Sequence, residues 1–197
     1  MDRKLRRIGV TVSIGWDPYM TRALARLKHE NILGRALKGE IPICQEEIDK
    51  LVVSRVHSAS VAAVLAHGND EDYYLIARGR RTKRTRSRLL RDIPAVGFCR
   101  MTWRPEYCMY QFRQFYVNVA LKGRGIGSQI MRTAIEQARE SRLTARGVFL
   151  MVGDYNTHAQ SMYEHWGFRR VPVEEPILDG PGGTDTGSQW LRMELHF

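Results

Sequence analysis

From residue 73 onwards the sequence has three strand-like segments in a row and then alternates helices with strands. β-Branched and aromatic residues are frequent in segments 73–79, 94–103 and 110–121, which polar or basic connections separate. We expect consecutive antiparallel strands there. The elements predicted after them are a helix over 126–142, a strand over 147–153, a short helix over 157–166 and a closing strand over 190–197. This order indicates a mixed α/β fold.

The first half of the sequence is less regular. A strand is predicted over 7–13, and Asp17 followed by proline is a good helix start. We expect that helix to end at Gly34, which would act as its C-terminal cap. Segment 45–56 has helical spacing, whereas the apolar segment 58–68 fits a helix or a strand and favours a helix.

The length and the apolar content favour one domain. A chain of 197 residues, 43% of them hydrophobic, can bury one sizeable core, so we expect a single domain over 1–197. No apolar run approaches the roughly 20 residues of a membrane span, and no signal-peptide cleavage pattern follows the basic start. The three cysteines lack CxxC spacing, which argues against a disulfide framework and a zinc site. We therefore expect a cytoplasmic protein without a metal.

A basic segment interrupts the predicted strands. Eight of the fourteen residues from Arg78 to Arg91 are Arg or Lys, within a chain of net charge +10. We interpret 80–92 as an insertion loop, because the connection is longer than a tight hairpin needs. Two interpretations remain open: the loop contacts an acidic partner such as a nucleic acid or ribonucleoprotein, or it is a solvated loop that keeps the protein soluble.

A glycine-rich turn joins the strand over 110–121 to the next helix. It reads Lys122-Gly123-Arg124-Gly125-Ile126-Gly127 and continues with Ser128. Glycines leave backbone N–H groups free to point at one anion, and a helix N-terminus adds its positive dipole end. The turn therefore predicts a pyrophosphate site. Its spacing is neither the GxGxxG dinucleotide fingerprint nor a Walker loop. The alternative is that the glycines serve only the geometry of the turn.

A second motif follows in the segment 156–168, NTHAQSMYEHWGF. Its defining residues are Asn156, Ala159, Tyr163, Gly167 and Phe168. Together with Lys122-x-x-Gly-x-Gly, this pattern resembles the GNAT family of acyl-CoA N-acyltransferases, whose motifs are Arg/Gln-x-x-Gly-x-Gly/Ala and Asn-x-x-Ala-x-x-x-Tyr-x-x-x-Gly-Phe. The resemblance runs from about residue 94 to the C-terminus. Lys122 departs from the usual arginine or glutamine, and Val119 stands where a proline is frequent.

The resemblance implies a fold and a donor. The fold would be a central, mostly antiparallel twisted sheet of about six or seven strands, flanked by about four helices. Its fourth and fifth strands would splay apart, so that acyl-pantetheine lies between them like an added strand. The backbones of Val117, Asn118 and Val119 match the positions that hold pantetheine. Residues 122–128 would wrap the pyrophosphate of acetyl-CoA, and exposed fifth-strand edges would allow a homodimer.

The resemblance also implies roles for single side chains. Tyr163 matches the general acid, a phenol that is protonated at neutral pH and can donate to the departing thiolate. A backbone N–H of the fourth strand, at Val119, would polarise the thioester carbonyl. Asn156 would contact the pantetheine arm, or only cap the helix that follows it. The acyl group would pass directly to an amine within a ternary complex.

The general base is not evident from the sequence. Segment 110–121 holds no Asp, Glu or His, so the fourth strand does not supply a carboxylate. Glu106 and Asp154 are candidates by location alone, and a water relay is the alternative. Cys99 and Cys108 could be acylated first, but a thiol on a strand is more often a small core residue.

Two function classes follow from these observations. The first is an N-acetyltransferase that uses acetyl-CoA and an unidentified amine, with an acidic or nucleic-acid-associated acceptor favoured by the basic segment. The second is a nucleic-acid-binding or regulatory module that keeps an acyl-CoA-binding fold with weak or lost catalysis. The missing base on the fourth strand favours the second class, and Tyr163 favours the first.

Overall fold

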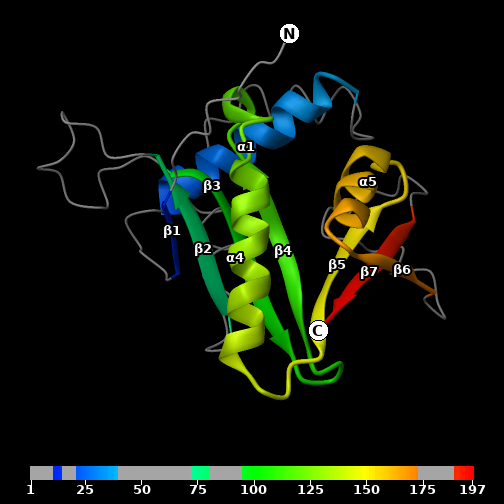
Figure 1. Ribbon diagram of the computed structural model, residues 1–197. Coiled ribbons are helices and arrows are strands. Elements are labelled where there is room, and N and C mark those ends of the chain that lie inside the picture. Colours follow the sequence, from blue (N-terminus) through cyan, green and yellow to red (C-terminus); the bar gives the residue numbers. More distant parts are fainter. Residues whose placement is uncertain (1–10, 15–20, 40–71, 80–94, 173–188) are drawn as a thin grey trace, which may run out of the picture.

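The computed structural model describes residues 11–14, 21–39, 72–79, 95–172 and 189–197. Within them one sheet of seven strands runs in the order β1-β2-β3-β4-β5-β7-β6 (Figure 1). The strands are β1 (Thr11–Ile14), β2 (Asp72–Arg78), β3 (Ala95–Arg104), β4 (Met109–Val117), β5 (Gly147–Gly153), β6 (Arg169–Val171) and β7 (Trp190–His196). The helices are α1 (Thr21–Ala36), η4 (Val119–Leu121), α4 (Ile126–Ser141) and α5 (Thr157–His165). The predicted α/β fold is confirmed.

One strand pair differs from all the others. β4 and β5 run parallel, whereas every other neighbouring pair in the sheet is antiparallel. The two strands pair over only four positions, from Met109 with Gly147 to Phe112 with Leu150. Beyond these positions β4 and β5 separate, as Figure 1 shows. The expected splay of the fourth and fifth strands is therefore present.

Helix α4 covers one face of the sheet. Its buried residues recur at helical spacing and pack on β2, β3, β4 and β5. They are Ile126, Ile130, Met131, Ala134 and Ala138. On β3 the alternate residues Cys99 and Met101 meet this face. The result is the larger of two hydrophobic clusters among the described residues.

Helix α1 covers part of the opposite face. Leu24 and Leu27 are buried against Tyr74, Ile76 and Phe98, which point away from α4 because side chains alternate along a strand. The helix contacts β3 and β4. It therefore lies beside the end of β4, where the two strands separate.

Two predicted boundaries are wrong. Helix α1 does not end at Gly34 but continues to Ala36, and a turn with Gly39 at φ +67° follows it. A Cβ on Gly34 would lie 3.6 Å from a methyl group of Val119, an ordinary contact distance, so nothing at this position requires glycine or ends the helix. Strand β4 ends at Val117 rather than at residue 121, because the chain turns into η4.

The prediction of an exposed fifth-strand edge is not met, and several other predictions concern residues outside the described ranges. β5 pairs with β7 along its whole length, from Gly147 to Gly153, so it is not an exposed edge for a homodimer. The residues before Thr11, the predicted helix 45–56, segment 58–68 and the insertion loop 80–92 lie outside the described residues. The homodimer and the loop's partner stay predictions.

Candidate active site

A cavity opens where β4 and β5 separate. It has a volume of about 670 Å³ and is lined by side chains of α1, β4, β5, α5 and β7. Phe112 and Leu150, the last paired residues, belong to its lining, as does the unpaired stretch of β4 from Arg113 to Tyr116. We call this space the central cavity. Its walls combine a backbone edge without a neighbouring strand and several polar side chains.

A bulge in β4 shapes this wall. Arg100 of β3 pairs with Arg113, but Phe98 pairs with Tyr116, so β4 holds one extra residue. Gln114 lies in this bulge and has a φ of +49°, which is uncommon for a residue other than glycine. Its Oε1 atom is buried and has no hydrogen-bond partner among the described residues. The bulge thus leaves an unpaired acceptor at the cavity wall.

Tyr163 lines the central cavity from α5. Its ring packs edge-on against Trp166 and Phe168, with ring centroids 6.0 and 5.9 Å apart. These contacts fix the ring without engaging its hydroxyl, which has no hydrogen-bond partner within the described ranges. Burial raises the pKa of Tyr163, and the charge of Arg35 opposes this rise. The phenol therefore remains a proton donor at neutral pH.

Tyr107, Tyr116 and Tyr155 also line this cavity, and the pKa values of two of them are shifted. Burial raises the pKa of Tyr116 to about 12 and also raises that of Tyr155. Arg35 opposes the rise at both phenols. Sequence reasoning missed this cluster, because Tyr116 fits an ordinary strand pattern and Arg35 is more than 80 residues before it.

Helix α1 contributes a polar stripe to the site. Lys28, Asn31 and Arg35 recur at intervals of three and four residues, so they share one face of the helix. Lys28 and Arg35 line the central cavity. Asn31 is buried, and its Nδ2 donates a hydrogen bond of 3.1 Å to the backbone oxygen of Val117. The spacing of these three residues could have predicted a polar helix face, but the sequence was examined only for apolar stripes.

Asn156 caps a helix and lies at the central cavity, while its contact with pantetheine stays a prediction. It is the N-cap of α5, and its side-chain oxygen accepts a hydrogen bond of 3.3 Å from the N–H of Ala159. It also lines the central cavity. Capping uses the Oδ1 atom, which leaves the amide nitrogen as the group that can face a ligand.

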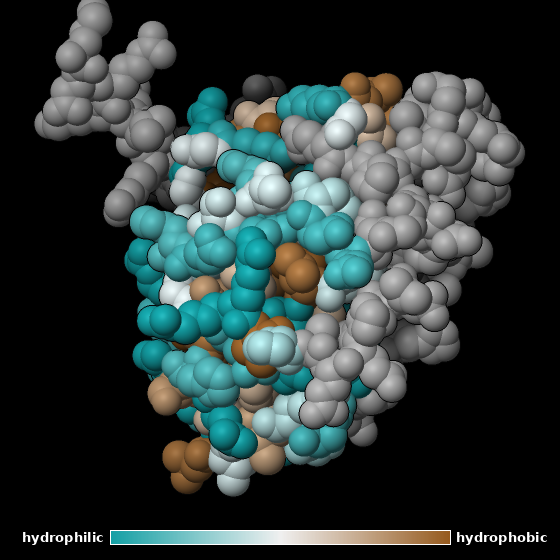
Figure 2. Space-filling model, turned by 90° about the vertical axis from the view of Figure 1, so that its right-hand side faces the viewer, coloured by the Kyte–Doolittle hydropathy of each residue, from teal (hydrophilic) through white to brown (hydrophobic). Residues whose placement is uncertain are grey.

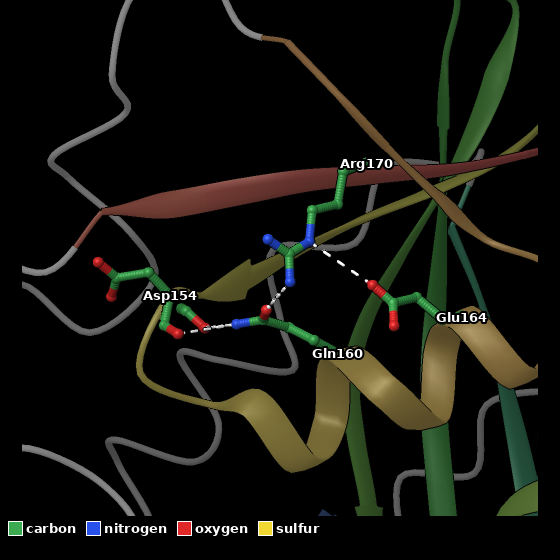
Figure 3. A network of polar contacts seen from close by, with 5 residues as sticks. Asp154, Gln160, Glu164 and Arg170 are labelled. Carbon is green, nitrogen blue, oxygen red and sulfur yellow. Dashed lines mark hydrogen bonds and ion pairs between the residues drawn. The ribbon is translucent and has the colours of Figure 1, made fainter.

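A buried amide holds the turn between β5 and α5. The Nε2 atom of Gln160 donates to the backbone oxygens of Gly153 and Asp154, both at 2.9 Å, and its Oε1 accepts from Arg170 at 2.6 Å (Figure 3). Glu164 lies 3.6 Å from the Nε atom of Arg170. This network fixes the end of β5 relative to the helix that carries Tyr163.

The two candidate bases differ in position. The carboxylate of Asp154 accepts a hydrogen bond of 2.8 Å from the N–H of Tyr155 and does not line the central cavity. Glu106 does line it, although this exposed residue lies in the turn between β3 and β4. Neither Cys99 nor Cys108 lines the cavity: Cys99 is fully buried in the core, and the thiol of Cys108, in the turn before β4, lies 3.6 Å from the backbone oxygen of Pro105. The structure therefore brings only Glu106 to the cavity.

The glycine-rich turn lies beyond the cavity wall, at the N-terminus of α4. Gly123 and Gly125 have φ values of +75° and +80°, and a Cβ would meet nothing within 4 Å at either position. Gly125 is the N-cap, and no side chain caps this terminus. Gly127 packs closely on the ring of Phe115, which lines the central cavity. The ring of Phe115 thus lies between the turn and the cavity, and residues 122–125 of the turn are exposed.

The three residues predicted to hold pantetheine divide between two elements. Val117 is the last residue of β4, whereas Val119 lies in η4. The side chain of Asn118 caps η4 by accepting a hydrogen bond from the N–H of Ala120. The backbone N–H of Asn118 donates to Val96 of β3. Only Val117 therefore keeps strand geometry at the splayed edge.

Cations outnumber carboxylates in the described lining of the central cavity. Arg192 of β7 lies over the rings of Tyr107 and Phe149, at 4.1 and 4.4 Å, and pairs with Glu194 at 2.7 Å. These contacts hold its guanidinium in place. The side of the molecule that carries α5, β6 and β7 is mostly hydrophilic, with small hydrophobic patches between polar side chains (Figure 2). The lining also includes Arg104, whose Nε donates to Gln111.

Comparison with known proteins points to one family. A family model described as the Acetyltransferase (GNAT) family matches residues 60–168. No curated protein sequence matches the chain. The matched range includes the splayed strands, the glycine-rich turn and α5.

Solved structures share the fold. PaiA N-acetyltransferase from Thermoplasma acidophilum, in complex with coenzyme A, has a TM-score of 0.64 at 14% identity, over 95% of this chain and 99% of that chain. Spermidine N-acetyltransferase from Vibrio cholerae, in complex with CoA and spermine, has a TM-score of 0.58 at 14% identity, over 95% of each chain. Nourseothricin acetyltransferase has a TM-score of 0.51 at 24% identity, over 64% of this chain and 66% of that chain. No helix in the described part of this chain has the length and apolarity to span a membrane.

Proposed function

The chain belongs to the GNAT acetyltransferase family, and on this premise we propose that it moves an acetyl group from acetyl-CoA to an amine by direct attack in a ternary complex. The observation that carries this proposal is the central cavity at the splay of β4 and β5, with Tyr163 and Asn156 on its wall. An unpaired strand edge can receive an extended ligand as an added strand.

The donor would span two neighbouring sites. Its pantetheine arm would lie along the unpaired edge of β4, and the amide nitrogen of Asn156 would contact it. The pyrophosphate would bind at the uncapped N-terminus of α4, where Lys122, the glycine-rich turn and Ser128 supply N–H groups and positive charge. The two sites follow one another along the chain, since β4 leads through η4 into this turn.

The backbone N–H of Val117 would polarise the thioester carbonyl. The N–H of Asn118 donates to β3, so the carbonyl of Val117 points away from β3, where Asn31 binds it. The N–H and C=O of one strand residue point to the same side, so the Val117 N–H also faces the splay. We therefore propose for Val117 the role that the sequence suggested for Val119.

The acid and the base would lie on different walls. The neutral amine attacks the carbonyl carbon, the C–S bond breaks, and Tyr163 protonates the departing thiolate. Glu106 is the candidate that takes the proton from the incoming ammonium, because it is the carboxylate on the cavity lining. A chain of water between Glu106 and the amine would serve the same step.

The acceptor would carry negative charge beside its amine. The cations of the lining are Lys28, Arg35, Arg104, Arg113 and Arg192, and Glu106 is the only carboxylate among its described residues. Glu194 pairs with Arg192, and both Arg35 and Arg113 have partners of their own. Lys28 and Arg104 still outnumber Glu106 among the described lining residues. A carboxylate or phosphate on the acceptor would balance this charge. A nucleic-acid-associated amine would in addition suit the basic segment 80–92.

Matched amines test the reaction and the acceptor class together. Ethanolamine, phosphoethanolamine and spermidine are each offered with acetyl-CoA, and CoA release is measured. We expect phosphoethanolamine to react with a kcat/KM at least about tenfold above that of ethanolamine, and spermidine to react least, since charge selects the acceptor. Binding of acetyl-CoA without acetylation of any amine, together with salt-sensitive nucleic-acid binding, would favour the regulatory module instead. A cytoplasmic location is part of the proposal and rests on the cysteine pattern.

A further inference from the structure

Lys28, whose side chain ends in a primary amine, lines the cavity where the proposed reaction acetylates amines. It lies one turn before Asn31 on α1, and Asn31 holds the end of β4 through Val117. Lys28 is half-buried and lines the central cavity, as Tyr163 does. A helix that packs on a sheet usually turns apolar residues inward, so an inward lysine requires an explanation.

The state of this amine favours nucleophilic attack. Burial lowers the pKa of Lys28, so a larger share of its side chain is neutral than for an exposed lysine. Within the described part of the chain, Lys28 forms no hydrogen bond and no ion pair. No carboxylate there holds it in the charged form. Lys38, in the turn after α1, is exposed and has an interaction of its own, so it offers the comparison of a surface lysine.

We propose that Lys28 is a self-acetylation site, which takes the acetyl group from acetyl-CoA bound in the central cavity. This inference rests on the proposed function, because it uses the same donor. The neutral Nζ bonds to the thioester carbonyl carbon, and the C–S bond breaks. The CoA sulfur leaves as a thiolate and takes the phenolic proton of Tyr163, while the proton lost by Nζ restores the phenol. The products are acetyl-Lys28 and free CoA.

Self-acetylation would change the site that performs it. The amide of acetyl-Lys28 is neutral, so the lining loses one of its cations. The added acetyl group also takes up space beside the acceptor. The modified protein should therefore discriminate less between phosphoethanolamine and ethanolamine.

Isotope-labelled donor tests the proposal on the full chain. The protein is incubated with trideuterioacetyl-CoA alone, and labelled lysines are mapped by mass spectrometry over time. The label separates new acetylation from any acquired during expression. We expect Lys28 to be labelled at least about tenfold faster than Lys38, since the bound thioester is held near it. An excess of CoA should suppress labelling of Lys28 and leave that of Lys38 unchanged.

Two measurements separate this proposal from the proposed function. Acetyl-CoA binding is measured by calorimetry on the same preparation, and Lys28→Arg keeps the charge but removes the nucleophile. The assignment is supported if the peptide that contains residue 28 carries no label in Lys28→Arg while labelling of Lys38 is unchanged. Binding of acetyl-CoA with Lys28 labelled no faster than Lys38 overturns the self-acetylation site alone. Absence of acetyl-CoA binding overturns the proposed function, and this inference with it.

Discussion

Asn31 of α1 donates a hydrogen bond of 3.1 Å to the backbone oxygen of Val117, 86 residues later in the chain. The bond ties a helix that lines the central cavity to the last residue of β4, the strand that splays from β5. Because Val117 ends its strand here, this side chain satisfies a carbonyl that no neighbouring strand reaches. The position of the proposed donor edge thus depends on α1.

Asn31→Leu removes this hydrogen bond while keeping the side-chain size. We expect a loss of about 1 kcal/mol in unfolding free energy, because a part-buried carbonyl oxygen loses its hydrogen bond. Acetyl-CoA affinity should fall as well, since the edge of β4 loses its support. Chemical denaturation and calorimetry measure the two effects. Arg26→Ala, which removes an exposed ion pair on the same helix, should change neither, and equal losses in both variants would contradict the role of Asn31.

Tyr163→Phe removes the proposed acid. We expect kcat to fall by about 10²- to 10⁴-fold with acetyl-CoA binding retained, since the ring packing is unchanged and only the proton donor is lost. Burial raises the pKa of Tyr163, so its protonated form extends to higher pH than that of an ordinary phenol. Wild-type activity should therefore persist above pH of about 10, the usual phenol pKa.

Tyr155→Phe is the matched control for this prediction, because Tyr155 is a second phenol on the same lining. Its activity should stay near that of the wild type. A comparable fall in Tyr155→Phe, with Tyr163→Phe active, would transfer the acid role to Tyr155.

Gln160→Glu removes the amide that holds the turn between β5 and α5. A carboxylate cannot donate to the backbone oxygens of Gly153 and Asp154, so we expect a loss of about 1–3 kcal/mol in unfolding free energy at neutral pH. Acidification should restore part of the loss, because a protonated Glu regains one donor. Thermal denaturation across pH measures this, and Ser161→Ala, at an exposed neighbour, is the control. A variant as stable as the wild type would show that the network is dispensable.

Gly125→Ala tests the glycine-rich turn. Gly125 has φ +80°, so a Cβ is strained by about 1–2 kcal/mol even though the space around it is open. Because it is also the N-cap of α4, the strain should move the N–H groups proposed to bind pyrophosphate and weaken acetyl-CoA binding. Gly39→Ala introduces the same strain at φ +67°, away from the cavity. It should lower stability equally without affecting acetyl-CoA, and a matching loss of affinity there would count against a pyrophosphate role for the turn.

Tyr116 makes stability sensitive to high pH. Burial raises its pKa to about 12 in the folded protein, above the value of about 10 in an unfolded chain. The stabilisation from its neutral form is complete below pH of about 10 and is lost as the pH rises towards 12. Denaturation at rising pH should show a fall that Tyr116→Phe reduces. Identical pH profiles for both proteins would show that Tyr116 does not titrate in this window.

Local patterns in the sequence predicted much of this protein. The boundaries of β5, the start of α4 and the span of α5 follow from hydrophobic periodicity and end signals, which act over a few residues. The glycine-rich turn and the motif around Tyr163 predicted the family, because both are short and continuous. The end of α1 was misjudged, since Gly34 lies inside the helix, two residues before its end at Ala36.

Only the tertiary structure decided how distant residues share one site. In the sequence alone, three residues of α1 are only polar positions on a helix: Lys28, Asn31 and Arg35. They become part of the site because α1 packs beside the splayed end of β4. The bulge at Gln114 arises from pairing with β3, which no local preference encodes. The sequence by itself determined the elements and the motif that mark the family. Long-range packing determined the charge of the cavity and the amine inside it, because both depend on contacts between segments far apart in the chain.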